Sequence, residues 1–162
     1  MKTLFLILSF SFCLSYANAQ KFVVEKDSLL GMYYVKSEKH DSLLQAYKAL
    51  GPETDCKTGN RAAYSNYVQR FVCTLLNQDI MDKLKKIDAA INIHYYFNKN
   101  GEFIDAVFFV DKIVLETLTM EDFQYVYQQC KKQRIDMRHL VWSGDFTYAW
   151  ISLYWYVPIR LR

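Results

Sequence analysis

The sequence predicts an α+β fold in which an antiparallel sheet packs against helices. Three observations support this prediction. Two alternating apolar runs flank an Asn-Gly pair within residues 91–110, which is the strongest short-range signal for a β-hairpin. A third alternating run, residues 148–161, predicts a long C-terminal strand. Elsewhere, apolar residues recur at helical spacing in segments that carry helix start and stop signals.

The turn sets the register of the hairpin. If Asn100 and Gly101 are the central residues of a type I′ turn, then Lys99 faces Glu102. The pairs further along the strands are then Phe97 with Ile104, Tyr95 with Ala106, Ile93 with Phe108 and Ile91 with Val110. These eight residues are the apolar set of both strands, and a slip of one residue would separate them onto two faces.

Before the hairpin, the N-terminal part of the chain predicts two short strands and a helix. Residues 22–25 and 32–36 read as strands around a polar turn, and they can form a hairpin that extends the sheet. Residues 41–50 fit a short helix whose start Asp41 can cap and which Gly-Pro ends. The polar residues 53–60 are expected to form a loop.

Three further segments fit helices. Residues 62–76 have helical spacing, although a strand stays an alternative, and residues 79–87 carry apolar residues on one side and lysines on the other. After the hairpin, Thr119 and Asp122 form a capping-box pattern. The helix that follows is predicted to bury Met120, Phe123, Val126, Tyr127 and Cys130.

The N-terminal residues 1–19 predict a cleaved signal peptide. They combine Lys2 with an apolar run and a small-residue Ala-Asn-Ala site before Gln20. A lipoprotein reading through Cys13 is disfavoured because bulky residues precede that cysteine. Residues 20–162 then form a single domain, without a further run of the ~18 apolar residues that a spanning helix needs. We therefore expect a periplasmic or extracellular protein.

Composition and cysteine count restrict the function further. The net charge is +3, and no basic block with interleaved aromatics indicates nucleic-acid binding. Of the three cysteines outside the leader, Cys56 and Cys73 form a disulfide in one interpretation and stay free thiols in the other. Cys130 lies on the buried stripe of its predicted helix and is expected to be a core thiol.

Nothing in the sequence predicts catalysis, a metal site or a cofactor. The histidines His40, His94 and His139 lie singly, without the spacing of a metal site. Asp105 falls opposite Tyr96, where a hydrogen bond is a better interpretation than acid–base catalysis. The sequence has no phosphate-binding loop and no nucleophile motif, so we expect a non-enzymatic protein.

The order of hairpin, helix and long last strand, with the ending WYVPIRLR, resembles the C-terminal domain of TonB-type energy transducers. The resemblance covers about residues 62–162, with residues 62–76 in the place of the family's preceding helix. It implies a sheet packed on helices and binding by strand addition. The sequence lacks the family's membrane anchor, its Pro-rich linker, the Tyr-Pro before the hairpin and the Trp-Pro-rich loop before the last strand. The resemblance therefore does not imply the transducer's role.

One face of the predicted sheet carries large aromatic residues and an arginine. Tyr, Trp and Arg dominate binding hot spots, so this face predicts an interaction surface made by Tyr96, Phe109, Trp150, Tyr154, Tyr156 and Arg160. The expected function is a protein–protein interaction module of the bacterial cell envelope that binds another envelope protein or a second copy, through this face or an edge strand. Two alternatives stay open. The N-terminal segment or the helices within residues 62–87 can cover the face, or the face can line a pocket for a small ligand.

Overall fold

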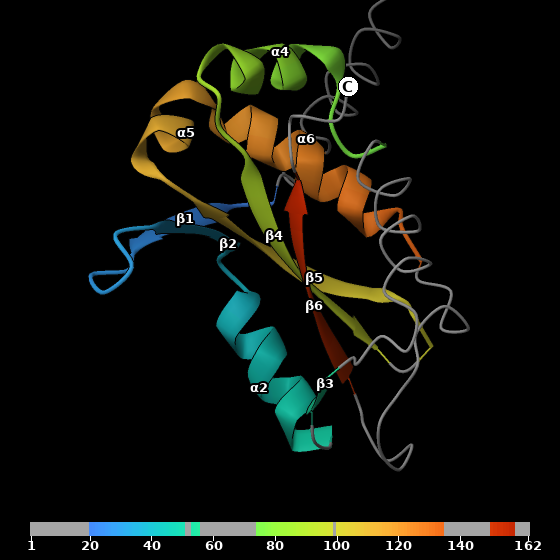
Figure 1. Ribbon diagram of the computed structural model, residues 1–162. Coiled ribbons are helices and arrows are strands. Elements are labelled where there is room, and N and C mark those ends of the chain that lie inside the picture. The colour runs from blue at the N-terminus through green and yellow to red at the C-terminus, as the bar shows by residue number, and fades with distance from the viewer. Residues whose placement is uncertain (1–19, 51–52, 56–73, 99, 135–149, 158–162) are drawn as a thin grey trace, which may run out of the picture.

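The computed structural model describes residues 20–50, 53–55, 74–98, 100–134 and 150–157, and for residues 53–55 and 150–157 it describes the backbone alone. Strands and helices both contribute large parts of this described chain, which confirms the α+β class (Figure 1). In chain order the elements are β1 (Phe22–Lys26), β2 (Tyr33–Ser37), α2 (His40–Leu50), β3 (Glu53–Asp55), α4 (Gln78–Lys86), β4 (Ile91–Asn98), β5 (Phe103–Val110), α5 (Lys112–Thr117), α6 (Met120–Lys131) and β6 (Trp150–Val157).

The described strands form one six-stranded sheet in the order β1-β2-β5-β4-β6-β3. Every neighbouring pair is antiparallel except β3 and β6, which run parallel. The N-terminal hairpin β1–β2 extends the sheet through β2 and β5, as the alternation predicted. The prediction of a loop was wrong for the residues of β3, because their backbone pairs with β6. Helices α4, α5 and α6 lie on one side of the sheet and α2 on the other (Figure 1).

The register of β4 and β5 agrees with the prediction over most of its length. Ile93 pairs with Phe108 and Tyr95 with Ala106. A register shift between Tyr96 and Phe97 then places Phe97 opposite Phe103, so the predicted pair of Phe97 and Ile104 was wrong. The extra residue allows Phe103 to pack on the main core while Ile104 packs with Tyr96 on the opposite face. This is the effect of a β-bulge, which redirects side chains near the end of a strand.

The turn of this hairpin is longer than predicted. The amide of Gly101 donates to the Asn98 carbonyl at 2.9 Å, and the amide of Asn98 donates to the Glu102 carbonyl at 2.9 Å. Of Asn100 and Gly101, only Gly101 has a positive φ, at 75°. A three-residue loop that ends in a left-handed glycine fits these bonds, and a type I′ turn does not. The Asn98 side chain favours this loop because its Oδ1 accepts from the amides of Asn100 and Glu102.

The main core lies between the sheet and helices α4, α5 and α6. The capping box of α6 is confirmed, with Thr119 accepting from the Asp122 amide and the Asp122 carboxylate accepting from the Thr119 amide. The predicted buried stripe of α6 is confirmed except at Met120, which is 39% exposed. The buried core contains Val35, Leu75, Leu76, Ile80, Leu84, Ile91, Ile93, Tyr95, Phe97, Ala106, Phe108, Val110, Val114, Leu118, Phe123, Val126, Tyr127 and Cys130.

Several predictions fall outside the described residues. They are the leader at 1–19, the Cys56–Cys73 pair, His139, Arg160 and most of the helix predicted for residues 62–76. The described end of that last segment, residues 74–76, is a turn rather than helix. Among the helices that the structure describes, none has the length and apolar character to cross a membrane.

Candidate functional site

The second face of the sheet, opposite the main core, is partly covered by α2. Tyr96 and Val107 are buried there, and Leu44 and Tyr47 of α2 pack against them. The chain therefore covers part of this face itself, with α2 from its N-terminal part, while residues 62–73 lie outside the described residues. A short connection after β2 brings α2 back across the sheet, and the Ser37 hydroxyl accepts from the Lys39 amide within it. Tyr96, predicted as part of an exposed surface, is only 7% exposed.

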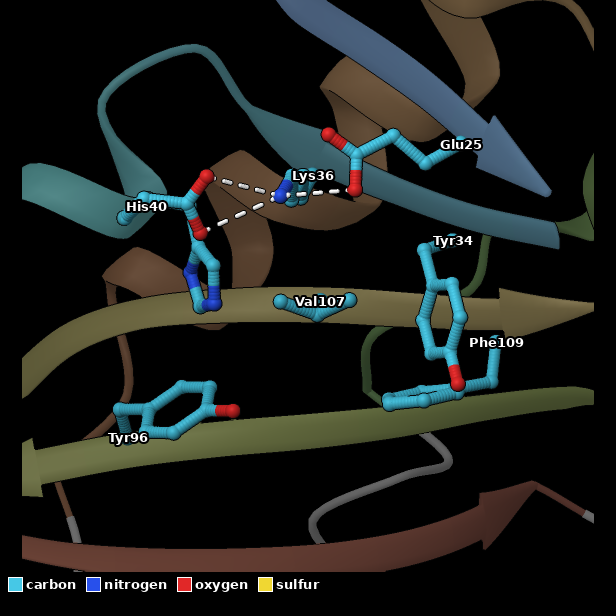
Figure 2. Close-up of a pocket in the computed structure, with 8 residues that line it drawn as sticks. Glu25, Tyr34, Lys36, His40, Tyr96, Val107 and Phe109 are labelled. Atoms are coloured by element: carbon cyan, nitrogen blue, oxygen red, sulfur yellow. Dashed lines mark hydrogen bonds and ion pairs between the residues drawn. The ribbon is translucent and has the colours of Figure 1, made fainter. Parts of the chain in front are cut away.

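A pocket of about 240 Å³ opens on this face beside the start of α2 (Figure 2). Strands β1, β2, β4 and β5 contribute side chains to it, together with the first turn of α2. Its walls combine aromatic rings with ionised groups, and Val107 lies between them on the floor (Figure 2). The lining residues are Glu25, Tyr34, Lys36, His40, Asp41, Tyr96, Val107 and Phe109.

An ion cluster centred on Lys36 forms one wall. Its Nζ lies 2.9 Å from a carboxylate oxygen of Glu25 and 2.9 Å from one of Asp41 (Figure 2). Partial burial by itself lowers the pKa of Lys36, but the hydrogen bonds and charges of the two carboxylates raise it above its usual value. The hydrogen bond from Lys36 lowers the pKa of Asp41. Asp41 therefore does not cap α2 as predicted. It lies inside the first turn and holds the lysine.

Aromatic rings form the opposite wall. Tyr34 and Phe109 meet edge to face, with ring centroids 4.5 Å apart. The Tyr34 hydroxyl donates to the Asp27 carboxylate at 2.5 Å, which fixes the ring from its far end and lowers the pKa of Asp27. The ring of Tyr96 lies 5.2 Å from the ring of His40. Because strands and a bonded tyrosine hold these rings, this wall is formed before any ligand arrives.

A buried hydrogen-bonded chain reaches the pocket through His40. Its Nδ1 lies 2.7 Å from the carboxylate of Asp105, and the Tyr127 hydroxyl donates to the other oxygen of that carboxylate at 2.7 Å. Asp105 is fully buried. The pairing of β2 with β5 ends at Lys36 and Val107, so Asp105 lies beyond the end of β2. Helices on both sides of the sheet therefore contact it, α2 through His40 and α6 through Tyr127.

The second ring nitrogen of His40, Nε2, makes no hydrogen bond within the part of the chain that the structure describes. The side chain is nevertheless only 7% exposed. A neutral imidazole that donates from Nδ1 to a carboxylate presents an acceptor at Nε2. His40 is thus a buried side chain at an open pocket whose second ring nitrogen has no described partner, and buried polar atoms in proteins normally have one.

His94 lies on the same face but has a different environment. Its Nδ1 is 3.1 Å from the Tyr96 hydroxyl, and burial, with a smaller effect from His40, lowers its pKa to about 4. The register places Tyr96 opposite Asp105 as predicted, yet the expected hydrogen bond between them was wrong. The Asp105 carboxylate is bonded to His40 and Tyr127 instead.

The remaining predicted surface residues lie on β6 and beyond it. The register sets Trp150, Tyr154 and Tyr156 opposite Asn98, His94 and Asn92, which are positions of the second face. Only their backbone is described, and Arg160 lies outside the described residues. The predicted set thus shares a face with the pocket through Tyr96, Phe109 and the β6 positions. Glu25, Lys36 and His40 were not predicted as site residues. The alternation of β2 puts Lys36 on the second face, and the helix start five residues later brings Asp41 close to it.

The described residues contain no group of three His, Cys, Asp or Glu side chains that could hold a metal ion. Cys130, the described thiol, is fully buried and donates to the Tyr95 hydroxyl at 3.2 Å. Burial raises the pKa of Cys130 to about 12. The prediction of a core thiol is confirmed, since Cys130 belongs to the main core.

Fold and site together define an α+β protein with a small, mixed aromatic and charged pocket on one sheet face. No protein-family model matches the chain, and neither does any curated protein. Among solved structures, the chain is similar to a DUF5043 family protein from Bacteroides uniformis ATCC 8492, with a TM-score of 0.56, 14% sequence identity and 87% of each chain covered. At this identity the similarity shows the fold alone. The likeness to TonB-type domains stays a prediction.

Proposed function

We propose that the protein is an exported, non-enzymatic binding protein that holds a small ligand in the pocket beside α2. The observation that supports this proposal is the pocket itself, with rigid aromatic rings on one wall and ionised groups on the other. Apolar walls with a few convergent polar groups are typical of ligand sites. Small-ligand binding is the alternative that the sequence left open, and the partial cover of the aromatic face by α2 favours it over a broad interaction surface.

The size of the pocket restricts the ligand. A volume of about 240 Å³ lies just below the roughly 300–1,000 Å³ of sites for drug-sized molecules. The occupant is therefore one ring or a short chain with one or two polar groups. Tyr34 and Phe109 provide the apolar contact, while His40 and the carboxylates of Glu25 and Asp41 provide polar contacts.

Ligand-observed NMR on the purified exported protein tests this function. The probes are single-ring compounds that carry an amine, a hydroxyl or a carboxylate. Val107→Phe places a ring into the pocket from its floor, so saturation transfer to a bound probe should disappear in this variant. Val24→Phe is the matched control, because Val24 is 42% exposed on β1 and does not line the pocket. Transfer that persists in Val107→Phe, or that is absent from the folded parent protein for every probe, would overturn the proposal.

A second candidate keeps the protein–protein interaction predicted from the sequence. β3 pairs with β6 only at Trp150–Ser152, and no described strand pairs with the same side of residues 153–157. An open strand edge is a template for strand addition by another chain. The partner would be another envelope protein or a second copy of this chain.

In-cell photo-crosslinking tests this candidate. The probe is placed at Tyr154, and the control probe is placed at Glu121, which is exposed on α6 on the opposite side of the sheet. Adducts at Tyr154 alone would support an interface, and their mass would separate a second copy from a foreign partner. Silence at Tyr154 in a folded protein would reject it. N-terminal sequencing of the exported protein, expected to begin at Gln20, tests the leader in the same preparation.

A further inference from the structure

We propose that the pocket is specific for a small organic cation, an amine whose ammonium group faces His40, Glu25 and Asp41 while its apolar body lies against Tyr34 and Phe109. This inference rests on the proposed ligand-binding function and specifies the ligand's chemistry. It combines three independent features of the site: its charge, its aromatic wall and the unsatisfied nitrogen of His40.

The charges in and behind the pocket sum to a negative value. Lys36 contributes +1, while Glu25, Asp41 and the buried Asp105 each contribute −1, which gives 1 − 3 = −2 with a neutral His40 and −1 with a protonated one. The single lysine is shared between two carboxylates and so cannot neutralise both. An anion would be repelled in either state of His40, whereas a cation would balance the site.

The aromatic wall favours the same charge. The faces of tyrosine and phenylalanine rings attract cations, with a gain of ~0.5–2 kcal/mol that rises as the site loses water. Tyr34 and Phe109 are fixed by their mutual edge-to-face contact and by the bond from Tyr34 to Asp27. An amine with an apolar body thus meets both an attractive ring surface and excess carboxylate within one small pocket.

His40 supplies the directional contact. Its Nδ1 lies 2.7 Å from the Asp105 carboxylate, and in the tautomer that donates there Nε2 is an acceptor. Among the described residues nothing donates to that atom, although only 7% of the His40 side chain is exposed. An ammonium group has donors to spare and can satisfy Nε2 and a carboxylate together.

Three probes of equal size and different charge test the proposal: 2-phenylethylamine, 2-phenylethanol and phenylacetate. Their affinities are measured by calorimetry and NMR titration. We expect the amine to bind roughly tenfold more tightly than the alcohol, and the acid to be weakest. Equal affinities, or preference for the acid, would overturn the cation inference. If the alcohol binds as well as the amine and Val107→Phe abolishes both, the ligand-binding function survives without it. If neither these three probes nor a lysine-containing peptide binds the folded protein, both the cation inference and the ligand-binding function are rejected.

Two substitutions locate the effect. Glu25→Gln should weaken the amine several-fold and leave the alcohol unchanged, because it removes charge from a side chain that is 56% exposed and need not disturb the fold. The control is Glu116→Gln, the same change at a 63% exposed position on α5, across the sheet from the pocket. His40→Asn keeps a donor for Asp105 but lacks Nε2, so it should weaken the amine and the alcohol alike. If Glu25→Gln and Glu116→Gln have equal effects, the assignment is wrong.

The cation can come from a free amine or from a lysine side chain of a partner protein. A short peptide with one central lysine, compared with its acetyl-lysine form, separates these sources. Binding of 2-phenylethylamine alone would assign the site to a free amine. Binding of the peptide alone would support cation recognition and would identify the ligand as a lysine side chain on the surface of a partner protein. In that case the acetyl-lysine peptide should not bind, because acetylation removes the charge of the lysine side chain but does not shorten it.

Discussion

The imidazole of His40 lies 2.7 Å from the carboxylate of Asp105, although the two residues are 65 positions apart. This contact attaches the first residue of α2 to strand β5. Through the second oxygen of the same carboxylate, Tyr127 attaches α6 to the same point from the other side of the sheet. One buried carboxylate thus fixes both helix layers, and the pocket depends on it because His40 lines the pocket wall.

Tyr127→Phe should lower the free energy of unfolding by about 1.5–3 kcal/mol, since a hydrogen bond to a buried carboxylate is lost. Urea unfolding followed by circular dichroism measures this change. Tyr125→Phe is the matched control, two residues away on α6 but 37% exposed. Equal unfolding midpoints for the two variants would show that the Tyr127 hydroxyl does not stabilise Asp105.

His94 should make the protein less stable as the pH falls. Burial lowers its folded-state pKa to about 4, against an ordinary value of 6.5, so between these values the unfolded chain binds a proton that the folded chain does not. Stability from His94 is therefore fully present above pH 6.5 and is lost as the pH falls toward 4. Allowing for the ring's partial exposure, the loss is about 1–2 kcal/mol. Urea midpoints at a series of pH values should fall less steeply for His94→Gln than for the parent protein, and parallel curves would contradict this.

The capping box at the start of α6 predicts a third effect. Thr119→Ala removes the side chain that accepts from the Asp122 amide, and it should cost about 1 kcal/mol of stability. Thermal unfolding provides the measurement. Thr117→Ala is a control of the same chemistry, because Thr117 is a half-buried residue at the end of α5 whose hydroxyl donates to a carbonyl of its own helix. A loss no larger than that of the control would mean that the cap contributes nothing.

Cys130 should resist alkylation in the native protein. Its thiol is fully buried and burial raises its pKa to about 12, so almost none of the reactive thiolate forms at pH 8. Peptide mapping after iodoacetamide treatment should show modification at this residue only when denaturant is added. Rapid labelling of the folded protein would indicate that α6 leaves the sheet under native conditions.

Local patterns were sufficient to predict much of the fold. The alternation of β4 and β5 predicted most of their register, and Thr119 with Asp122 predicted the start of α6, because both signals act over a few residues. The turn prediction failed because the Asn98 side chain accepts from two loop amides, which stabilises a longer loop than Asn-Gly alone suggests. β3 was missed because a three-residue strand carries too short an alternation to detect.

The site was harder to predict than the fold. Tyr96 and Phe109 were identified because large aromatic residues on one strand face stand out in the sequence. His40 was not, since its role depends on Asp105, and no spacing in the sequence relates residues that only the sheet brings together. Lys36 was assigned to a strand without a role, because its partners Glu25 and Asp41 belong to a neighbouring strand and a following helix.

The sheet order has a consequence for biogenesis. β6, the last strand of the described chain, lies between β4 and β3, and β3 has β6 as its strand neighbour. A nascent chain can therefore form β1, β2, β5 and β4 early, but it cannot incorporate β3 until the C-terminal strand has been synthesised. A stop codon before Trp150 would remove two strands from the sheet rather than one. Completion of the described sheet therefore has to wait until residues Trp150–Val157 have been synthesised, although β3 precedes them by about a hundred residues.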